Sequence, residues 1–185
     1  MNTKCSVFIA TSVDGFIART DGELDWLTGG ETSEVDEDYG YQNFIDTVDA
    51  LIMGRNTFDK VLTFEEWPYS KKVIVLTNRS LKIPEKLSEA VVIMSGSPQE
   101  IVDQFSNEGF HHFYIDGGKT IQNFLKAGLI QEIILTRIPV IIGSGIPLFG
   151  PVGNDIKLEH VSTRSFKNGF VQSKYNVIPD TIQRH

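Results

Sequence analysis

Three short segments combine glycines, cations and hydroxyl side chains in a way that suits the binding of phosphate groups. The first is Gly54-Arg55-Asn56-Thr57, which follows an apolar run and supplies a glycine, a cation and two side chains able to cap a helix. Backbone N–H groups at the start of a helix are unpaired and favour anions. The segment is therefore a candidate phosphate site, with a helix cap and a solvent-exposed arginine as the alternative interpretation.

The second segment is Thr77-Asn78-Arg79-Ser80, which also follows an apolar run and is followed by Lys82. Dinucleotide sites that prefer NAD hold the ribose 2′-hydroxyl with an acidic residue, whereas an arginine accommodates a 2′-phosphate. This segment contains an arginine and hydroxyls but no acid, so it indicates a ligand with a 2′-phosphate. A polar turn is the alternative.

The third segment is Asp116-Gly117-Gly118-Lys119-Thr120. It is not a P-loop, because that motif requires a glycine at position 113, where the chain has Phe113. Two glycines before a helix still allow a pyrophosphate to approach the backbone, and a tight turn is the alternative. A further glycine cluster at 143–148 lacks the last glycine of G-x-G-x-x-G, and its Pro147 predicts a loop.

The apolar runs before these segments have the length of buried strands. We predict strands at 6–10, 50–54, 72–77, 90–94, 112–116 and 132–142. Segments with helical spacing lie between them, and we predict helices at 34–47, 56–65, 98–107 and 119–127. Asn56 is the expected N-cap of the second helix; Ser97 is the expected N-cap of the third, with Pro98 as its first helical residue. This alternation favours a largely parallel sheet between helices.

The C-terminal part of the chain has a different pattern. Two alternating runs flank Asn168-Gly169, a strong signal for an antiparallel hairpin. We therefore predict an α/β fold of three layers, with a mixed, mainly parallel sheet of about eight strands, helices on both faces and a C-terminal hairpin. If the three segments leave the same edge of this sheet, together they can hold one dinucleotide with a 2′-phosphate.

Composition limits the remaining possibilities. A chain of 185 residues predicts a single domain, 1–185, and its net charge of -7 provides no basic field for nucleic acid or an anionic membrane. Cys5 is the one cysteine, and the four histidines show no ligand spacing, so we expect no metal site. No run approaches a membrane span and the N-terminal apolar run is short, so we expect a cytoplasmic protein.

Several strings in the chain resemble the dihydrofolate-reductase-like superfamily, in the branch of the reductase domain of the riboflavin-biosynthesis deaminase-reductase. They are IATSVDGFIARTDGELDWLTGG, DALIMGRNTFD, VIVLTNRS, FYIDGGKTIQNFLKAGLIQEIIL and PVIIGSGIPLFG, in family order and together spanning about residues 5–178. The resemblance implies NADPH as cofactor. It implies that the cofactor-binding residues are Ala10, Ile17, Trp26, Gly54, Arg55, Asn56, Thr57, Thr77, Arg79, Ser80, Gly117, Gly118, Lys119, Thr120 and Ile121.

The resemblance also implies an activity, the transfer of hydride to a pterin-type, pyrimidine-type or carbonyl substrate. This activity is similar to that of the 5-amino-6-(5-phosphoribosylamino)uracil reductase domain. The resemblance places Leu24, Asp38 and Asp116 at the substrate, with Asp38 as the catalytic proton donor. A solvated helix-face acid is the alternative for Asp38. A dihydrofolate reductase-type activity and a non-catalytic NADPH-binding module are the alternatives for the whole chain.

Two departures from that family affect the expected substrate. One cysteine excludes the zinc deaminase module of the bifunctional members. No Lys or Arg lies between Arg19 and Arg55, whereas ten acids do, so a phosphorylated substrate placed there would be repelled. We further expect a homodimer, with the C-terminal hairpin and the apolar run 139–142 as its surface.

Overall fold

A computed structural model of the chain describes residues 3–27 and 37–179. Its strands are β1 (Lys4–Ser12), β2 (Phe16–Ala18), β3 (Ala50–Gly54), β4 (Lys72–Leu76), β5 (Val91–Met94), β6 (His112–Asp116), β7 (Glu132–Ile138), β8 (Ile146–Pro147), β9 (Leu158–Ser165) and β10 (Val171–Val177). Its helices are α1 (Tyr41–Asp46), α2 (Arg55–Val61), the 3₁₀ turn η2 (Glu85–Leu87), α3 (Pro98–Asn107) and α4 (Gly118–Lys126).

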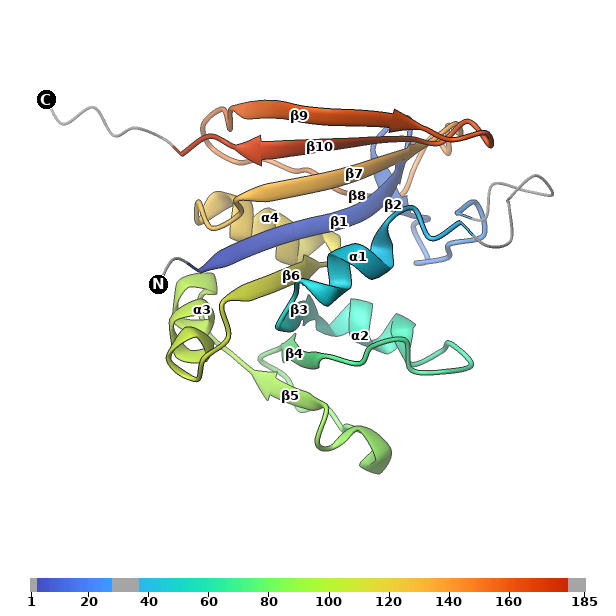
Figure 1. Ribbon diagram of the computed structural model, residues 1–185. Helices are drawn as coiled ribbons and strands as arrows, with labels where there is room; N and C mark the ends of the chain where they lie inside the picture. Colours follow the sequence, from blue (N-terminus) through green and yellow to red (C-terminus); the bar gives the residue numbers. More distant parts are fainter. Residues whose placement is uncertain (1–2, 28–36, 180–185) are drawn as a thin grey trace, which may run out of the picture.

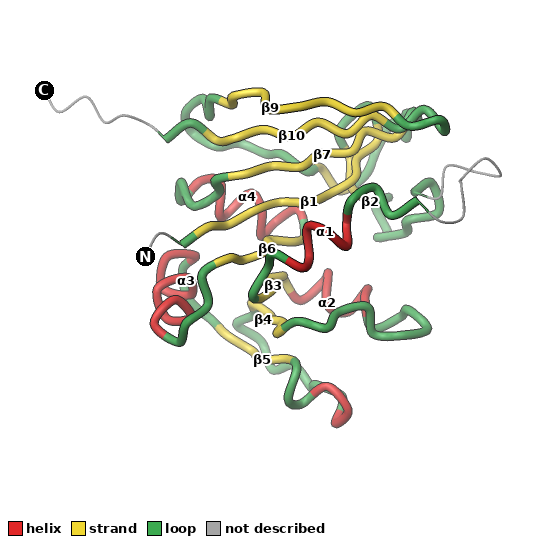
Figure 2. The backbone as a smooth tube through the Cα atoms, in the orientation of Figure 1, coloured by secondary structure: helices red, strands yellow, loops and turns green. Residues whose placement is uncertain are grey.

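Eight of the strands form one sheet in the order β5-β4-β3-β6-β1-β7-β10-β9 (Figures 1 and 2). The strands from β5 to β7 are parallel to their neighbours, and β10 and β9 are antiparallel. The predicted mixed, mainly parallel sheet is thus confirmed. Strand β7 ends at Ile138 rather than at 142, because Pro139 has no N–H to donate to a ladder.

Helices cover both faces of the parallel part of the sheet. One apolar cluster joins α3 and α4 to one face, and another joins α1 and α2 to the other. Alternate residues of β3 supply both clusters, since Ile52 belongs to the first and Leu51 and Met53 to the second. The three predicted layers follow from this alternation.

Two helices match their predicted positions and two do not. Helix α3 begins at Pro98 with a capping box in which Ser97 Oγ accepts from Glu100 N at 3.3 Å, and α4 lies within one residue of its prediction. Helix α2 begins one residue early, at Arg55, with Gly54 rather than Asn56 as its N-cap.

Helix α1 begins later than predicted, at Tyr41. Residues 34–36 lie outside the described ranges, and 37–40 form a turn in which Tyr39 has φ 55° and Gly40 has φ 82°. Two successive residues in the left-handed region cannot continue a right-handed helix. Asp38 therefore precedes the helix instead of lying on its face.

The C-terminal hairpin forms where Asn168-Gly169 predicts it. Phe166 N donates to Phe170 O at 2.9 Å, and Gly169, with φ 84°, closes a three-residue loop through its N–H to Phe166 O at 3.0 Å. The hairpin loop is therefore a turn followed by a residue, Gly169, in the left-handed backbone conformation. The edge strand β9 is exposed along all eight of its residues, so no helix covers this end of the sheet.

The remaining strands, β2 and β8, form a separate antiparallel pair. The predicted loop at 143–148 thus contains a two-residue strand. A Cβ at Gly145 would collide with Ala18 O, so the glycine there permits the close pairing. Within the described ranges, no helix is long and apolar enough to cross a membrane.

Candidate active site

The three predicted phosphate segments lie together at one edge of the sheet. Strands β4, β3 and β6 are adjacent and parallel, so their carboxyl ends face the same way. β3 runs directly into α2 and β6 into α4, while β4 runs into the turn at 77–80. Arg55 Nη1 donates to Ser80 O at 3.3 Å and so connects the first segment to the second.

Two glycines let threonine side chains of the first and third segments approach each other's backbone. Gly117 has φ 89°, and a Cβ there would collide with Thr57 Oγ1. A Cβ at Gly54 would lie 3.0 Å from Thr120 Oγ1. Because neither position has room for a larger side chain, each glycine lets the opposite threonine approach the backbone.

The same glycine turn is also in contact with the loops at the β2–β8 pair. A Cβ on Gly118 would lie 2.9 Å from Pro147 O and 3.1 Å from Ile17 Cδ1. Ile17, predicted at the cofactor, lies on β2 and is therefore next to the Gly117-Gly118 turn. Ile121, also predicted at this turn, is buried in the core below it.

This edge offers donors and positive charge to an anion. Helix α4 begins without a side-chain cap, so its first N–H groups are available to a ligand. Arg79 and Lys119 are exposed, and within the described ranges no carboxylate lies at ion-pair distance from either. Thr77 Oγ1 accepts from Arg79 N at 3.1 Å, which fixes the turn that presents Arg79.

The sheet opens beside this edge, between β1 and β6. Their pairing stops at Ser6 and Tyr114, and beyond it β1 continues along β7 while β6 continues along β3. The Phe8 carbonyl in this gap accepts from Tyr114 Oη at 2.9 Å. Such a split between strands is where ligands bind in open α/β sheets.

Ala10 lies on β1 beyond the last pair with β6, in an apolar cluster with Trp26, Ile138 and Phe170. Trp26 is 7% exposed, and its Nε1 finds no hydrogen-bond partner in the described part of the chain. Trp67 Nε1 also has no partner among the described residues, so the free indole N–H of Trp26 is available to a ligand without by itself identifying one. Ala10 and Trp26, both predicted at the cofactor, are thus brought together.

Asp116 ends β6 at this opening. Its Oδ1 accepts from Gly117 N at 2.8 Å, and burial raises its pKa to about 6. The same carboxylate helps to raise the pKa values of Tyr41, Tyr69 and Tyr114, for which burial is the main cause. A carboxyl that keeps its proton until near neutral pH suits proton donation.

Asp38 has the opposite environment. It is exposed, and its carboxylate accepts from Gln42 N at 2.9 Å and Gly40 N at 2.8 Å. These bonds lower its pKa, so the carboxyl holds no proton near pH 7. The geometry therefore gives Asp38 the role of capping the start of α1 and does not support the predicted donation of a proton.

The acids of the interval 20–54 that the structure describes are dispersed and do not together line one pocket. Asp25 pairs with Arg19 at 2.6 Å and Glu23 with Lys60 at 2.8 Å, and both pairs are exposed. Asp49 accepts from two backbone N–H groups at the start of β6, the opposite edge of the sheet. Leu24, predicted at the substrate, is half-buried in the turn before Trp26, while Glu31, Glu34 and Asp36 lie outside the described ranges.

Sequence reasoning missed one group of polar residues near this opening. Arg164, Gln172 and Lys174 of the hairpin line a hollow together with Phe8 of β1 and Tyr39. The hairpin signal identified the strands, but only their register with β7 and β1 assigns these side chains to the same face as Phe8. The part of the chain that the structure describes contains no cluster of three or more metal-ligating side chains.

Comparison with known proteins adds to this geometry. The family described as the RibD C-terminal domain matches residues 3–172. A putative riboflavin biosynthesis protein from Shewanella sp. PV-4 is 40% identical, with a TM-score of 0.89 over 95% of this chain and 99% of that one.

Two more distant structures share the fold. The deaminase and 5-amino-6-(5-phosphoribosylamino)uracil reductase of Thermotoga maritima is 15% identical, with a TM-score of 0.74 over 96% of this chain and 57% of that one. Dihydrofolate reductase from Enterococcus faecalis, solved with NADP(H), is 17% identical, with a TM-score of 0.65 over 94% and 96% of the two chains.

Proposed function

Since this chain belongs to the RibD C-terminal domain family and has a dihydrofolate-reductase-like fold, we propose that it is an NADPH-dependent reductase of a small pyrimidine-type substrate. The observation that carries the proposal is the convergence of three loops at one sheet edge, where Gly54 and Gly117 contact Thr120 and Thr57 through backbone. The likeness to a uracil reductase and to a reductase solved with NADP(H) supports it.

The residues of this edge fit such a cofactor. The uncapped start of α4 and the Gly117-Gly118 turn would hold the pyrophosphate, and Arg79 with Ser80 the 2′-phosphate. Trp26, with its unpartnered indole N–H, would line the nicotinamide end beside Ala10. Bound NADPH supplies the hydride, and the protein positions the reacting groups and excludes water.

The proton for the reduced substrate is assigned to Asp116 in place of Asp38. Asp116 lies at the opening between β1 and β6, and its carboxyl has a raised pKa of about 6. A protonated Asp116 can donate to a substrate nitrogen or oxygen as hydride adds to the adjacent carbon. Donation leaves a carboxylate that regains its proton from solvent.

Thermal unfolding with NADPH, NADH and no ligand tests the cofactor. A ligand at 100 times its dissociation constant adds about 2.7 kcal/mol to the free energy of unfolding. We expect this stabilisation with NADPH and less with NADH, and Arg79→Gln should remove the difference, while Lys86→Gln, an exposed lysine in η2, should keep it. Equal stabilisation by both cofactors in the wild type would refute the role of Arg79.

Turnover separates the enzyme from its alternatives. NADPH oxidation is measured with 5-amino-6-(5-phosphoribosylamino)uracil, dihydropterins and small carbonyl compounds. We expect oxidation with the pyrimidine. Oxidation only with a dihydropterin would indicate a dihydrofolate reductase-type activity, and NADPH binding without any oxidation would indicate a binding module.

A further inference from the structure

The two halves of the sheet are joined by a short seam between β1 and β6. These strands pair over three residues, 4–6 with 112–114, whereas β1 and β7 pair over seven. The strands β5, β4, β3 and β6 lie on one side of the seam and β1, β7, β10 and β9 on the other. The ligand opening lies beyond the carboxyl end of the seam, so the contacts that hold the seam also set the width of that opening.

A chain of side-chain hydrogen bonds crosses the seam at its amino end. Ser6 Oγ of β1 lies 2.8 Å from His112 Nε2 of β6 and 3.4 Å from Glu132 Oε1 of β7. Ser6 and Glu132 are both buried. The chain therefore connects three adjacent strands where water has little access.

The partners of His112 define where its ring carries hydrogen. Nδ1 lies 2.8 Å from the carbonyl of Thr47, which can only accept, so Nδ1 is protonated. In the neutral ring Nε2 is then without hydrogen and accepts from the Ser6 hydroxyl. A proton added to Nε2 would reverse this bond and turn the Ser6 hydrogen towards Glu132, at the longer distance of 3.4 Å.

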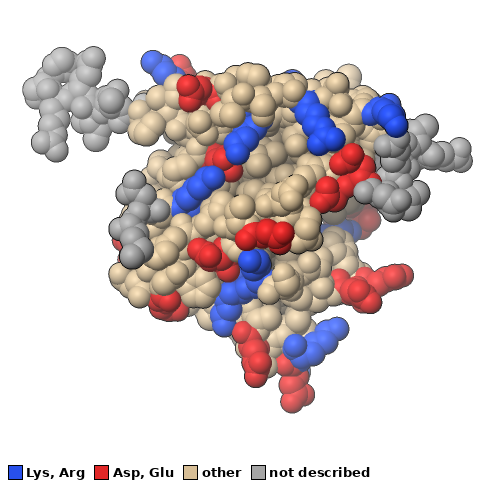
Figure 3. Space-filling view, in the orientation of Figure 1, with Lys and Arg blue, Asp and Glu red and all other residues tan. Residues whose placement is uncertain are grey.

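The carboxylate at the far end of the chain is already held by two cations. Glu132 Oε2 lies 3.1 Å from Lys4 Nζ and 2.7 Å from Lys174 Nζ. Figure 3 shows basic side chains spaced along the strands from β1 to the hairpin on this face. A charged His112 would add a third cation beside one carboxylate.

Other groups around the ring only partly offset this effect. Asp49, just before β3, accepts from the backbone N–H groups of His111 and His112 at 2.7 and 2.8 Å. Phe44 of α1 packs edge-on against the ring, with centroids 6.1 Å apart. Burial lowers the pKa of His112 most and Lys4 lowers it further, while the carbonyl bond and the two carboxylates raise it. The ring is therefore neutral near pH 7.

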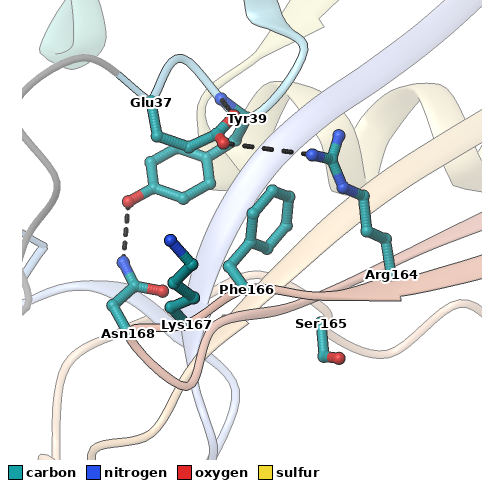
Figure 4. Close-up of a pocket in the computed structure, with 7 residues that line it drawn as sticks. All are labelled: Glu37, Tyr39, Arg164, Ser165, Phe166, Lys167 and Asn168. Atoms are coloured by element: carbon teal, nitrogen blue, oxygen red, sulfur yellow. Dashed lines mark hydrogen bonds and ion pairs between the residues drawn. The ribbon is translucent and has the colours of Figure 1, made fainter.

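Helix α1 packs over the seam, with ring contacts to both β1 and β6 (Figure 1). Its end is held at Thr47 by His112. Its start is held by the hairpin, where Asn168 Nδ2 donates to Tyr39 Oη at 2.7 Å (Figure 4) and Gln172 Nε2 donates to the Tyr39 carbonyl at 3.0 Å. Release of the His112 ring would thus free one end of α1 as well as the seam.

We propose that His112 is a proton-sensitive latch, which as a neutral imidazole holds β1, β6 and the end of α1 together and which loosens them when it takes up a proton. The latch lies at the edge of the sheet opposite the ligand segments and acts in the chain without ligand. Because β1 and β6 also border the ligand opening, the width of that opening becomes dependent on pH.

The direction of the pH dependence follows from the burial of the ring. His112 binds a proton less readily in the closed seam than in water, so closure is fully stabilised above the ordinary histidine pKa of about 6.5. This stabilisation is lost as the pH falls below that value. The sign is opposite to that of Asp116, whose protonated form the fold favours.

Nitrogen NMR of the imidazole rings tests the latch in the wild-type chain. Spectra are recorded between about pH 8 and about pH 5, for the folded chain and for the chain unfolded in urea. We expect folded His112 to carry its hydrogen on Nδ1 at the higher pH, and to titrate at a lower pH than in urea. A hydrogen on Nε2, or a midpoint at or above the urea value, would overturn the proposal.

Amide hydrogen exchange measures the loosening itself. Each rate is divided by the intrinsic rate at the same pH, so that only opening of the structure is compared. Between pH 7.5 and pH 5, exchange across the β1–β6 seam should become about tenfold faster. The ladder of β3 and β4, which pair over five residues without a histidine, should change much less. Equal acceleration of both ladders would indicate general acid unfolding and contradict the latch.

Three substitutions distinguish a latch from a bond that is merely structural. His112→Gln has no proton to gain, so its seam exchange should not depend on pH. Ser6→Ala removes the partner of Nε2, so it should speed seam exchange several-fold at pH 7.5 and add little at pH 5, where that bond is already lost. His160→Gln, at an exposed histidine of β9 bonded to Thr163 Oγ1, is the matched control and should keep the wild-type response.

The latch is refuted if His112→Gln keeps the pH response, if His160→Gln abolishes it, or if Ser6→Ala acts equally at both pH values. Should His112→Gln not fold, the ring spectra of the wild type and the exchange of Ser6→Ala still decide between the outcomes. None of these measurements uses NADPH or a substrate, so a failure of the latch is distinguishable from a failure of the proposed function.

Discussion

The two carboxylates considered as proton donors, Asp38 and Asp116, have opposite environments. Asp38 is exposed and accepts two backbone N–H bonds, which stabilise its ionised form. Asp116 is partly buried and accepts one such bond, from Gly117 N, so burial dominates and favours its protonated form. The family resemblance implied Asp38 as the donor, and the sequence does not report the burial that distinguishes it from Asp116.

Replacing Asp116 by asparagine should separate stability from activity. The folded-state pKa of about 6 is above the unfolded value, so the Asp116 contribution to stability is present at low pH and lost as the pH rises through 6. At pH 7.5, Asp116→Asn should therefore raise the free energy of unfolding by about 1–3 kcal/mol. The difference should vanish below about pH 4, and denaturant unfolding at both pH values measures it.

The same substitution should lower turnover by about 100-fold or more, because an amide cannot donate the proton. Wild-type turnover should fall as the pH rises through about 6. Asp38→Asn is the matched control, and it should retain both turnover and its pH profile. If Asp38→Asn rather than Asp116→Asn abolishes turnover, the assignment of the donor is reversed.

At the scale of elements, the sequence predicts what depends on local pattern. Buried strands such as 50–54, the N-cap at Ser97 and the hairpin at Asn168-Gly169 are confirmed within a residue or two. The start of α1 was mispredicted because Tyr39 adopts a left-handed conformation that the hairpin imposes from 129 residues further along the chain. Contacts of this separation leave no local signal.

The convergence of the loops predicts a specific effect at Gly117. Gly117→Ala places a methyl group against Thr57 at a positive φ, so it should cost stability and also displace the start of α4. Gly153→Ala has a similar φ of 86° with nothing within 4 Å, and it measures the backbone strain alone. We expect Gly117→Ala to cost at least about 1 kcal/mol more, and to weaken NADPH binding about tenfold.

Chemical denaturation and NADPH titration of the two variants provide these comparisons. Equal losses of stability would mean that Thr57 moves aside freely, and that the contact between the loops does not require glycine. Unchanged NADPH affinity in Gly117→Ala would place the pyrophosphate elsewhere.

At the scale of the whole molecule, composition and structure describe charge differently. The ten acids between Arg19 and Arg55 predicted repulsion of a phosphorylated substrate. Of those that the structure describes, Asp25 and Glu23 are paired with cations and Asp49 lies at the opposite edge of the sheet, away from Arg79 and Lys119. Net charge contains no positional information, so only the tertiary arrangement gives the cofactor edge its local sign.

The uncovered edge of the sheet supports our proposal of a homodimer. All residues of β9 are exposed, including Leu158 and Val161, and an exposed edge strand presents unpaired backbone groups to a second copy. Sedimentation should give twice the chain mass of 20.7 kDa. Val161→Lys should shift the mass to that of one chain, whereas Phe64→Lys, at an exposed apolar residue elsewhere, should leave it unchanged. A single-chain mass for the wild type would contradict the proposal.

Cys5 is the only cysteine of the chain and lies on β1, paired on both sides in the middle of the sheet. It is 1% exposed, and burial raises its pKa to about 12. Thiol reagents therefore react only when the start of β1 separates from its neighbours. The rate of alkylation in native buffer reports how often this part of the sheet opens, and the variants described above can be compared by that rate without an added label.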